Sequence, residues 1–352
     1  MISTVFSFLN QTTDEIRTTW LTNLTKEASQ TTNELHPVLQ EFQHLIESNQ
    51  RIYMLFQSMW NQAREKTPNQ NRSHEVQNYH GYALFIDPEV NTMLKKVLDV
   101  WGTFLSSSES VSVLDTSSTG WFGPEAIHKL NTTGNIGGTR YGFDELYICD
   151  RNAPYYGFQS WDAFFTRSFR ENIRPVASPD DDSVIANGLT YSLVDMFGAG
   201  FPDSFIGGTI YQGYLDTFSY HRWHAPVSGK VVKAYTLDGT YCSTPRAIDG
   251  VQIDYQVYLS AMATRAVVFI QADDPDIGLV GFLGIGMVEI STCEITVGEG
   301  QYVRKGDQIG MFHYGGSSHC VIFQKGVDVT GFPEVGTREN VPVRGRLAVV
   351  KR

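Results

Sequence analysis

The chain of 352 residues is long enough to bury a large core, and its 41% hydrophobic and 18% charged residues are typical of a globular protein. Its formal net charge of −11 argues against nucleic acid and anionic membranes as partners. No apolar run reaches the roughly 18 residues that a membrane-spanning helix needs, and the start lacks a signal-peptide pattern, so we expect a cytoplasmic protein.

The N-terminal part, residues 1–145, is predicted to be a helical domain. Apolar residues recur at helical spacing in 37–60 and in 87–105, and these stripes are expected to face a core. Residues 106–150 are rich in Ser, Thr and Gly, which indicates a linker or a set of loops.

The remainder, residues 146–352, is predicted to be a catalytic domain. An amphipathic helix is expected over 160–176, ending before Pro175. From about residue 185, short β-branched and aromatic runs such as RAVVFIQAD and GLVGFLGIGMVEI alternate with glycines. This pattern predicts a largely antiparallel β core, and the fold class is therefore α+β.

The stretch 311-MFHYGGSSHCVIFQ-324 has two interpretations. Gly315 and Gly316 between two strand-like runs suit a surface hairpin. A serine after a glycine in a strained turn can also attack the preceding carbonyl, provided that a base such as histidine activates its hydroxyl.

A second candidate region is 217-TFSYHRWHAPVSGKVV-232, where His221 and His224 stand three residues apart. They can be partly buried histidines at a strand end. Alternatively, together with His313 or His319 they would supply three imidazole ligands to a metal ion, although no CxxC spacing or well-placed carboxylate supports a metal.

Three segments in order, WDAFFTRSFRENIRP, YHRWHAP and VRKGDQIGMFHYGGSS, resemble the motifs of the phosphatidylserine decarboxylase family. Residues 35–350, including the element DVWGTFLSS, further resemble a soluble fungal branch that decarboxylates aromatic L-amino acids such as tryptophan. The resemblance implies a zymogen that cleaves itself, with a β-rich core that carries a covalent pyruvoyl group and no metal.

The resemblance also implies roles for particular residues. The chain would break between Gly316 and Ser317, which leaves a β chain ending at Gly316 and an α chain of 36 residues whose Ser317 becomes the pyruvoyl group. Ser318 is the alternative nucleophile. His224 would activate the serine, and His221 would handle the substrate carboxylate or return a proton.

The implied reaction is Schiff-base formation with an amine substrate, followed by loss of CO2. The expected partner is a small amino acid, most simply an aromatic one, and the alternative is phosphatidylserine, converted to phosphatidylethanolamine. The cleaved α and β chains would stay associated, and a homodimer is left open.

One departure from the family's pattern bears on maturation. The aspartate that orients the histidine of the family is replaced by Asn187, or else a segment between Ala186 and Asn187 is missing. Asp195 would substitute only if the fold brought it near. Because an amide cannot stabilise an imidazolium as a carboxylate does, an uncleaved non-catalytic relative remains an alternative.

Overall fold

The computed structural model describes most of the chain. Its residues form two compact units, each with most of its contacts within itself. One unit holds the described residues of Met1–Trp101 and Thr240–Leu259, and the other those of Gly102–Gly239 and Ser260–Arg352. The described residues are 34–66, 79–118, 120–136, 138–181, 184–185, 196–197, 203–215, 218–241, 255–286, 292–313, 317–334 and 341–351. The functional division at residue 145 stays a prediction.

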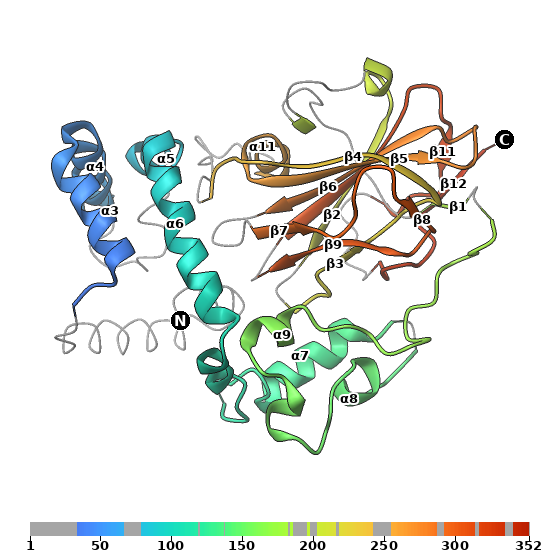
Figure 1. Cartoon of the computed structure of the whole chain (residues 1–352), viewed down its shortest axis with the longest axis horizontal. Helices are drawn as coiled ribbons and strands as arrows, with labels where there is room; N and C mark the ends of the chain where they lie inside the picture. Colours follow the sequence, from blue (N-terminus) through green and yellow to red (C-terminus); the bar gives the residue numbers. More distant parts are fainter. Residues whose placement is uncertain are drawn as a thin grey trace. The chain divides into compact units, whose positions relative to one another are not determined.

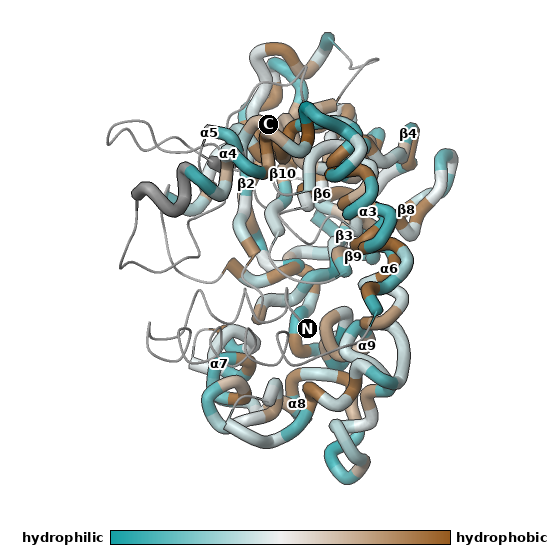
Figure 2. Tube along the Cα trace, turned by 90° about the vertical axis from the view of Figure 1, so that its left-hand side faces the viewer, coloured by the Kyte–Doolittle hydropathy of each residue, from teal (hydrophilic) through white to brown (hydrophobic). Residues whose placement is uncertain are grey.

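The first unit contains the helices α3 (Pro37–Ser48), α4 (Gln50–Lys66), α5 (Tyr79–Phe85) and α6 (Pro88–Leu105). Hydrophobic and hydrophilic stretches alternate along α3 and α6 in Figure 2. The buried faces meet in a small core of Ile52, Met59, Leu84 and Val90. The predicted helices are confirmed, but Leu39 and Trp60 lie off the buried face, with 39% and 44% exposure.

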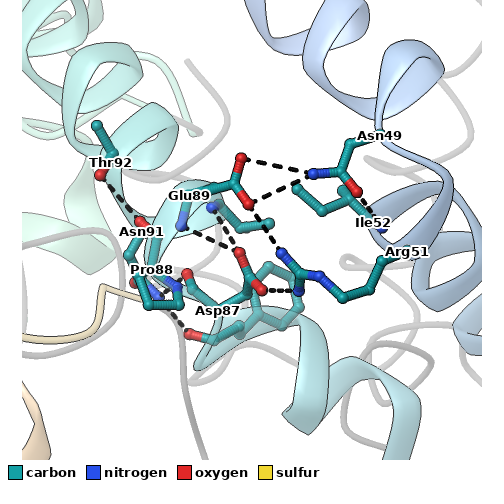
Figure 3. A network of polar contacts seen from close by, with 10 residues as sticks. Asn49, Arg51, Ile52, Asp87, Pro88, Glu89, Asn91 and Thr92 are labelled. Carbon is teal, nitrogen blue, oxygen red and sulfur yellow. Dashed lines mark hydrogen bonds and ion pairs between the residues drawn. The ribbon is translucent and has the colours of Figure 1, made fainter.

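A polar network in this unit holds the start of α6 against α4 (Figure 3). Asp87 precedes α6, and its Oδ1 accepts from the N–H groups of Glu89 at 3.0 Å and Val90 at 3.2 Å, as a helix N-cap does. Arg51 of α4 donates to Asp87 and, at 2.9 Å, to Glu89. Burial alone would raise the pKa of Asp87, but these bonds outweigh it and leave that pKa lowered.

The segment 106–150 contradicts the prediction of loops. It holds η2 (Ser108–Val113), α7 (Pro124–Gly134) and α8 (Phe143–Leu146). Pro124 suits the first turn of α7, and Ala126, Leu130 and Gly134 recur every four residues on its buried side, a stripe that the Thr- and Gly-rich composition concealed.

The predicted helix 160–176 is also wrong in length, since α9 spans only Trp161–Phe165. Ser160 caps its start, where its side chain accepts from Ala163 N–H at 3.0 Å. Further on, Phe169 forms an isolated β-bridge with Tyr147, which an α-helix would not allow. Rings from α8, α9, η3 (Pro154–Gly157) and the turn before α7 pack together here, including Phe122 and Phe164, whose centroids are 5.3 Å apart.

The β core consists of three antiparallel sheets, as predicted (Figure 1). The six-stranded sheet has the order β2-β10-β6-β5-β4-β8, and the two three-stranded sheets have the orders β3-β9-β7 and β1-β12-β11. Their bounds are β1 Val184–Ile185, β2 Thr209–Leu215, β3 Arg222–His224, β4 Gly229–Leu237, β5 Arg265–Ala272, β6 Leu279–Gly286, β7 Thr292–Ile295, β8 Tyr302–Val303, β9 Gln308–His313, β10 Ser317–Phe323, β11 Val329–Thr330 and β12 Ala348–Val350. Two further short helices are η4 (Asp203–Phe205) and α11 (Tyr255–Met262).

The glycine-serine stretch is not a hairpin. β9 pairs with β3 and β7, whereas β10 pairs with β2 and β6, so the chain passes from one sheet to another at this point. Trp223 of β3 fills the space between the sheets. A Cβ at Gly284 of β6 would lie 2.6 Å from its indole, and a Cβ at Gly310 of β9 would lie 2.3 Å from it. The two glycines therefore make room for the ring.

Candidate active site

Ser317 and Ser318 begin the strand β10, and both side chains are fully buried. Successive strand residues point to opposite faces of a sheet, so the two hydroxyls lie on different faces. The Oγ of Ser318 accepts from Gln212 Nε2 at 2.9 Å. The Oγ of Ser317 has no hydrogen-bond partner among the described residues. A buried hydroxyl without a partner is costly, and this difference favours Ser317 as the reactive serine.

His221 lies immediately before β3 and is buried, with 1% exposure. Its ring stacks on Phe165, with centroids 4.2 Å apart, and Phe165 stacks on Trp161 at 4.9 Å. The carbonyl of His221 accepts from Phe312 N–H at 3.0 Å. This bond joins His221 to β9, the strand that precedes the glycine-serine stretch. The position of this histidine is therefore set by α9 and β9 together.

His224, the last residue of β3, ends a second stack of rings. Tyr147, Phe169, Tyr220 and His224 follow one another with centroid distances of 4.8, 4.6 and 5.7 Å. The Nδ1 of His224 lies 2.8 Å from the carbonyl oxygen of Gly306, and its Nε2 lies 3.2 Å from the hydroxyl of Tyr220. A carbonyl only accepts, so Nδ1 carries the proton and Nε2 is the basic nitrogen.

The surroundings of His224 oppose its protonation. Burial lowers its pKa first, and the cations of Arg344 and Arg222 lower it further, to about 3, although the Gly306 carbonyl acts in the opposite direction. The guanidinium Nε of Arg344 lies 3.2 Å from His224 Nδ1. A backbone carbonyl thus occupies the place that a carboxylate takes beside the histidine of a Ser-His-Asp triad.

The third histidine of the region, His313, is held by two carboxylates. Its Nδ1 lies 2.9 Å from Asp162 Oδ1 and its Nε2 lies 2.7 Å from Glu294 Oε2. Burial lowers the pKa of His313, but the hydrogen bonds and charges of Asp162 and Glu294 outweigh it, so that its pKa is raised. Both ring nitrogens then donate, and His313 links α9 and β7 at the end of β9.

This ion-paired cluster has a testable consequence for stability. A histidine whose pKa is raised on folding contributes stability that is complete below its unfolded pKa of about 6.5 and is lost as the pH rises through its folded pKa. We expect His313→Gln to lower the free energy of unfolding by about 1 kcal/mol at pH 6 and by less at pH 9. Urea unfolding at both values measures this, with His80→Gln at an exposed position as the control. A loss that is equal at both values would contradict it.

The other predicted groups are distributed as follows. Gly316, Asn187 and Asp195 lie outside the described residues.

Within the described ranges, no three side chains of His, Cys, Asp or Glu form a metal-binding group, so the alternative site of His221, His224 and His313 finds no support. The contacts of Gly306 and Arg344 with His224 were missed, because no sequence spacing signals a contact across 82 or 120 residues.

The arginines of the segment 160–176 have a structural role, as the sequence favoured. Arg167 donates to the carbonyls of Phe164 at 3.2 Å and Phe218 at 2.9 Å. Its guanidinium also lies over the Tyr147 ring, 4.5 Å from the centroid, and that of Arg174 lies 4.6 Å from the Phe169 centroid. Both cations thus support the ring stack that ends at His224.

The chain is similar in sequence to known decarboxylases. A family model described as phosphatidylserine decarboxylase matches residues 161–346, and a second such model matches 36–80 and 78–130. The chain is 41% identical to the decarboxylase iboD of Amanita muscaria over 72% of its own length and 82% of the relative's. It is 38% identical to an L-tryptophan decarboxylase of Psilocybe cubensis, over 73% and 68% of the two chains. A phosphatidylserine decarboxylase proenzyme of Schizosaccharomyces pombe is 26% identical over 54% of this chain and 21% of that proenzyme.

These matches first define the class, which is that of the carboxy-lyases, since each of these relatives is a decarboxylase. More particularly, the chain belongs to the phosphatidylserine decarboxylase family. Among the residues that the structure describes, no helix is long and apolar enough to cross a membrane.

Proposed function

We propose that this chain is a self-processing decarboxylase of an aromatic L-amino acid, and that Ser317 supplies its pyruvoyl group. The observation that carries the proposal is the buried Ser317 hydroxyl, which follows Gly315-Gly316 and has no partner in the described structure, whereas Ser318 is hydrogen bonded. The preference for an aromatic amino acid rests on the similarity to L-tryptophan decarboxylases at 38% and 37% identity.

In the proposed maturation, the peptide bond before Ser317 is broken and Ser317 becomes the pyruvoyl group. The Oγ of Ser317 attacks the carbonyl carbon of Gly316, the peptide C–N bond breaks, and an ester replaces the amide while the amino group of residue 317 becomes free. Loss of the α-proton expels the Gly316 carboxylate and leaves a dehydroalanine. One water then enters and one ammonia leaves, which gives a ketone at the new N-terminus.

In the described structure no hydrogen bond joins Ser317 to its proposed base, His224, so the two would have to approach each other for this step. Nε2 of His224 is the unprotonated nitrogen that can accept the proton of the serine hydroxyl, and the stacked rings hold its imidazole in place. His221 is tied to β9, which leads into the cleavage stretch. It is the candidate to handle the substrate carboxylate or return a proton.

In the processed enzyme, the pyruvoyl group at residue 317 would supply a ketone conjugated to an amide carbonyl, which accepts the electrons released with CO2. The buried, unpaired position of the Ser317 side chain fits a group that must exclude water and hold no competing hydrogen bond.

Cleavage would not release the α chain. β10 lies between β2 and β6, paired along its whole length from Ser317 to Phe323 on both sides. The 36 residues from Ser317 to Arg352 also include β11 and β12. The backbone hydrogen bonds of a central strand would therefore hold the two chains together after the peptide bond is broken.

Intact mass under denaturing conditions tests processing, and CO2 release tests the reaction. We expect two chains, a C-terminal one beginning at residue 317, and CO2 release from tryptophan above that from tyrosine, phenylalanine or phosphatidylserine. The match to phosphatidylserine decarboxylase models keeps that phospholipid as the second candidate substrate. A persistent single chain without activity would indicate an uncleaved, non-catalytic relative instead.

A further inference from the structure

Arg344 lies in the segment after Ser317 and contacts His224 from 120 residues away. It is one of five non-glycine residues with a positive φ among those described, at 63°. Its carbonyl accepts from Ala177 N–H at 2.8 Å, and the next residue, Gly345, donates to the Pro342 carbonyl at 3.0 Å. A left-handed arginine costs free energy, and such strain is concentrated at functional sites.

The hydrogen bonds around His224 assign its protons. The Nε of Arg344 lies 3.0 Å from the carbonyl oxygen of Gly306 and 3.2 Å from His224 Nδ1. His224 Nδ1 lies 2.8 Å from the same oxygen. The carbonyl only accepts, so its 2.8 Å contact requires a proton on Nδ1. The longer Arg344 Nε–Nδ1 contact is a hydrogen bond only if Nδ1 lacks that proton, and Arg344 Nε–H bonds the same carbonyl in either case. The arrangement is satisfied by a neutral ring with its proton on Nδ1.

The charged groups around the ring also favour a neutral imidazole. The charged or titratable groups on the elements around His224 are Tyr220, Arg222, Lys305, Asp307 and Arg344. Lys305 Nζ donates to two backbone carbonyls, of Ser178 and Asp181, and Asp307 accepts from Arg304 N–H. Arg222 donates to the Thr166 carbonyl and to Gln308. Within the described parts of the chain, no carboxylate bonds the His224 ring, and the charges that lower its pKa are those of the cations Arg344 and Arg222.

We propose that Arg344 is a positioning residue that holds His224 as a neutral imidazole, with Nδ1–H on the Gly306 carbonyl and an unprotonated Nε2 that faces the Tyr220 hydroxyl. The cation beside Nδ1 opposes a second ring proton, and the shared carbonyl fixes which nitrogen carries the first one. This pair of contacts would orient the ring as a triad carboxylate does, but it disfavours the imidazolium instead of stabilising it.

The consequence for maturation rests on the proposed role of His224. If that role is correct, Nε2 remains unprotonated well below the usual histidine pKa of about 6.5, so processing loses no rate as the pH falls through that value. The same cation makes His224 a weak base, so the step is slow. Arg344 lies on the α-chain side of the cleavage point and His224 on the β-chain side, so the contact joins the two chains after processing.

The test is a direct titration of His224 in the full chain by nitrogen-15 NMR of the imidazole, with His224→Ala to assign its signals. We expect the wild-type ring to show the Nδ1–H tautomer and no titration between about pH 5 and pH 8. Arg344→Lys should keep the pKa low, Arg344→Gln should raise it, and Arg344→Glu should raise it most, by about two pH units. Arg346→Glu makes the same charge change at an exposed position two residues away and should leave His224 unchanged.

The proposal is overturned if the wild-type ring carries its proton on Nε2, or if the Arg344 and Arg346 variants titrate alike. The wild-type tautomer decides the question even where a variant fails to fold. If the titration follows the expected order while His224→Ala matures normally, the inference about Arg344 stands and the proposed role of His224 fails.

Discussion

Ser317→Ala is expected to leave one uncut chain of 352 residues that releases no CO2 from any amino acid. The substitution removes the hydroxyl that attacks the Gly316 carbonyl, and no other group can become the ketone at the same position. The side chain is buried and makes no hydrogen bond in the described structure, so its loss leaves no partner unsatisfied. Intact mass and CO2 release measure the two losses on the same sample.

Ser318→Ala is the matched control for this experiment. It removes the hydrogen bond that Gln212 Nε2 donates to Ser318 Oγ, which costs about 1 kcal/mol of stability, but the chain should still be cut and active. Two chains from Ser317→Ala together with a single chain from Ser318→Ala would show that the cleavage point lies one residue further on.

His224→Ala is expected to slow maturation by a factor of about 10²–10⁴, the usual contribution of a general base. Turnover per processed chain should fall much less, because the ketone, once made, no longer needs the serine to be activated. The precursor is followed by intact mass after a synthesis pulse. Turnover is then divided by the fraction of chains that carry the ketone.

His80→Ala, at an exposed position in the first unit, serves as the control and should mature at the wild-type rate. Normal maturation of His224→Ala would rule out the proposed role. His221 would then be the next residue to substitute, since its carbonyl bond to Phe312 N–H ties it to β9.

The Gly306 carbonyl, which His224 Nδ1 and the Arg344 guanidinium share, would let the proposed base keep its orientation without a carboxylate. An imidazole needs its Nδ1–H held if Nε2 is to point in a constant direction. The Gly306 carbonyl does this at 2.8 Å. What a carboxylate adds, stabilisation of the imidazolium, is absent here, and the neighbouring arginines have the opposite effect.

The sequence predicted the strands well and the irregular parts poorly. Runs such as RAVVFIQAD became β5, because β-branched residues and flanking glycines act locally. The segment 160–176 was predicted as one helix because its aromatic residues recur at helical spacing. In the structure, α9 ends at Phe165 and Phe169 bridges to Tyr147, since a contact with a distant segment outweighed local helix propensity.

The sequence by itself determined the fold class and the family, because motifs and alternation are local properties of the chain. The residues that it assigned to the chemistry stay a prediction. Only the tertiary structure decided that β10 is a central strand and that β9 and β10 belong to different sheets. It also brought Arg344 to His224 and gave Ser318, but not Ser317, a hydrogen-bond partner. Strand partners and the charges around a ring depend on residues far apart in the chain, and no local pattern records them.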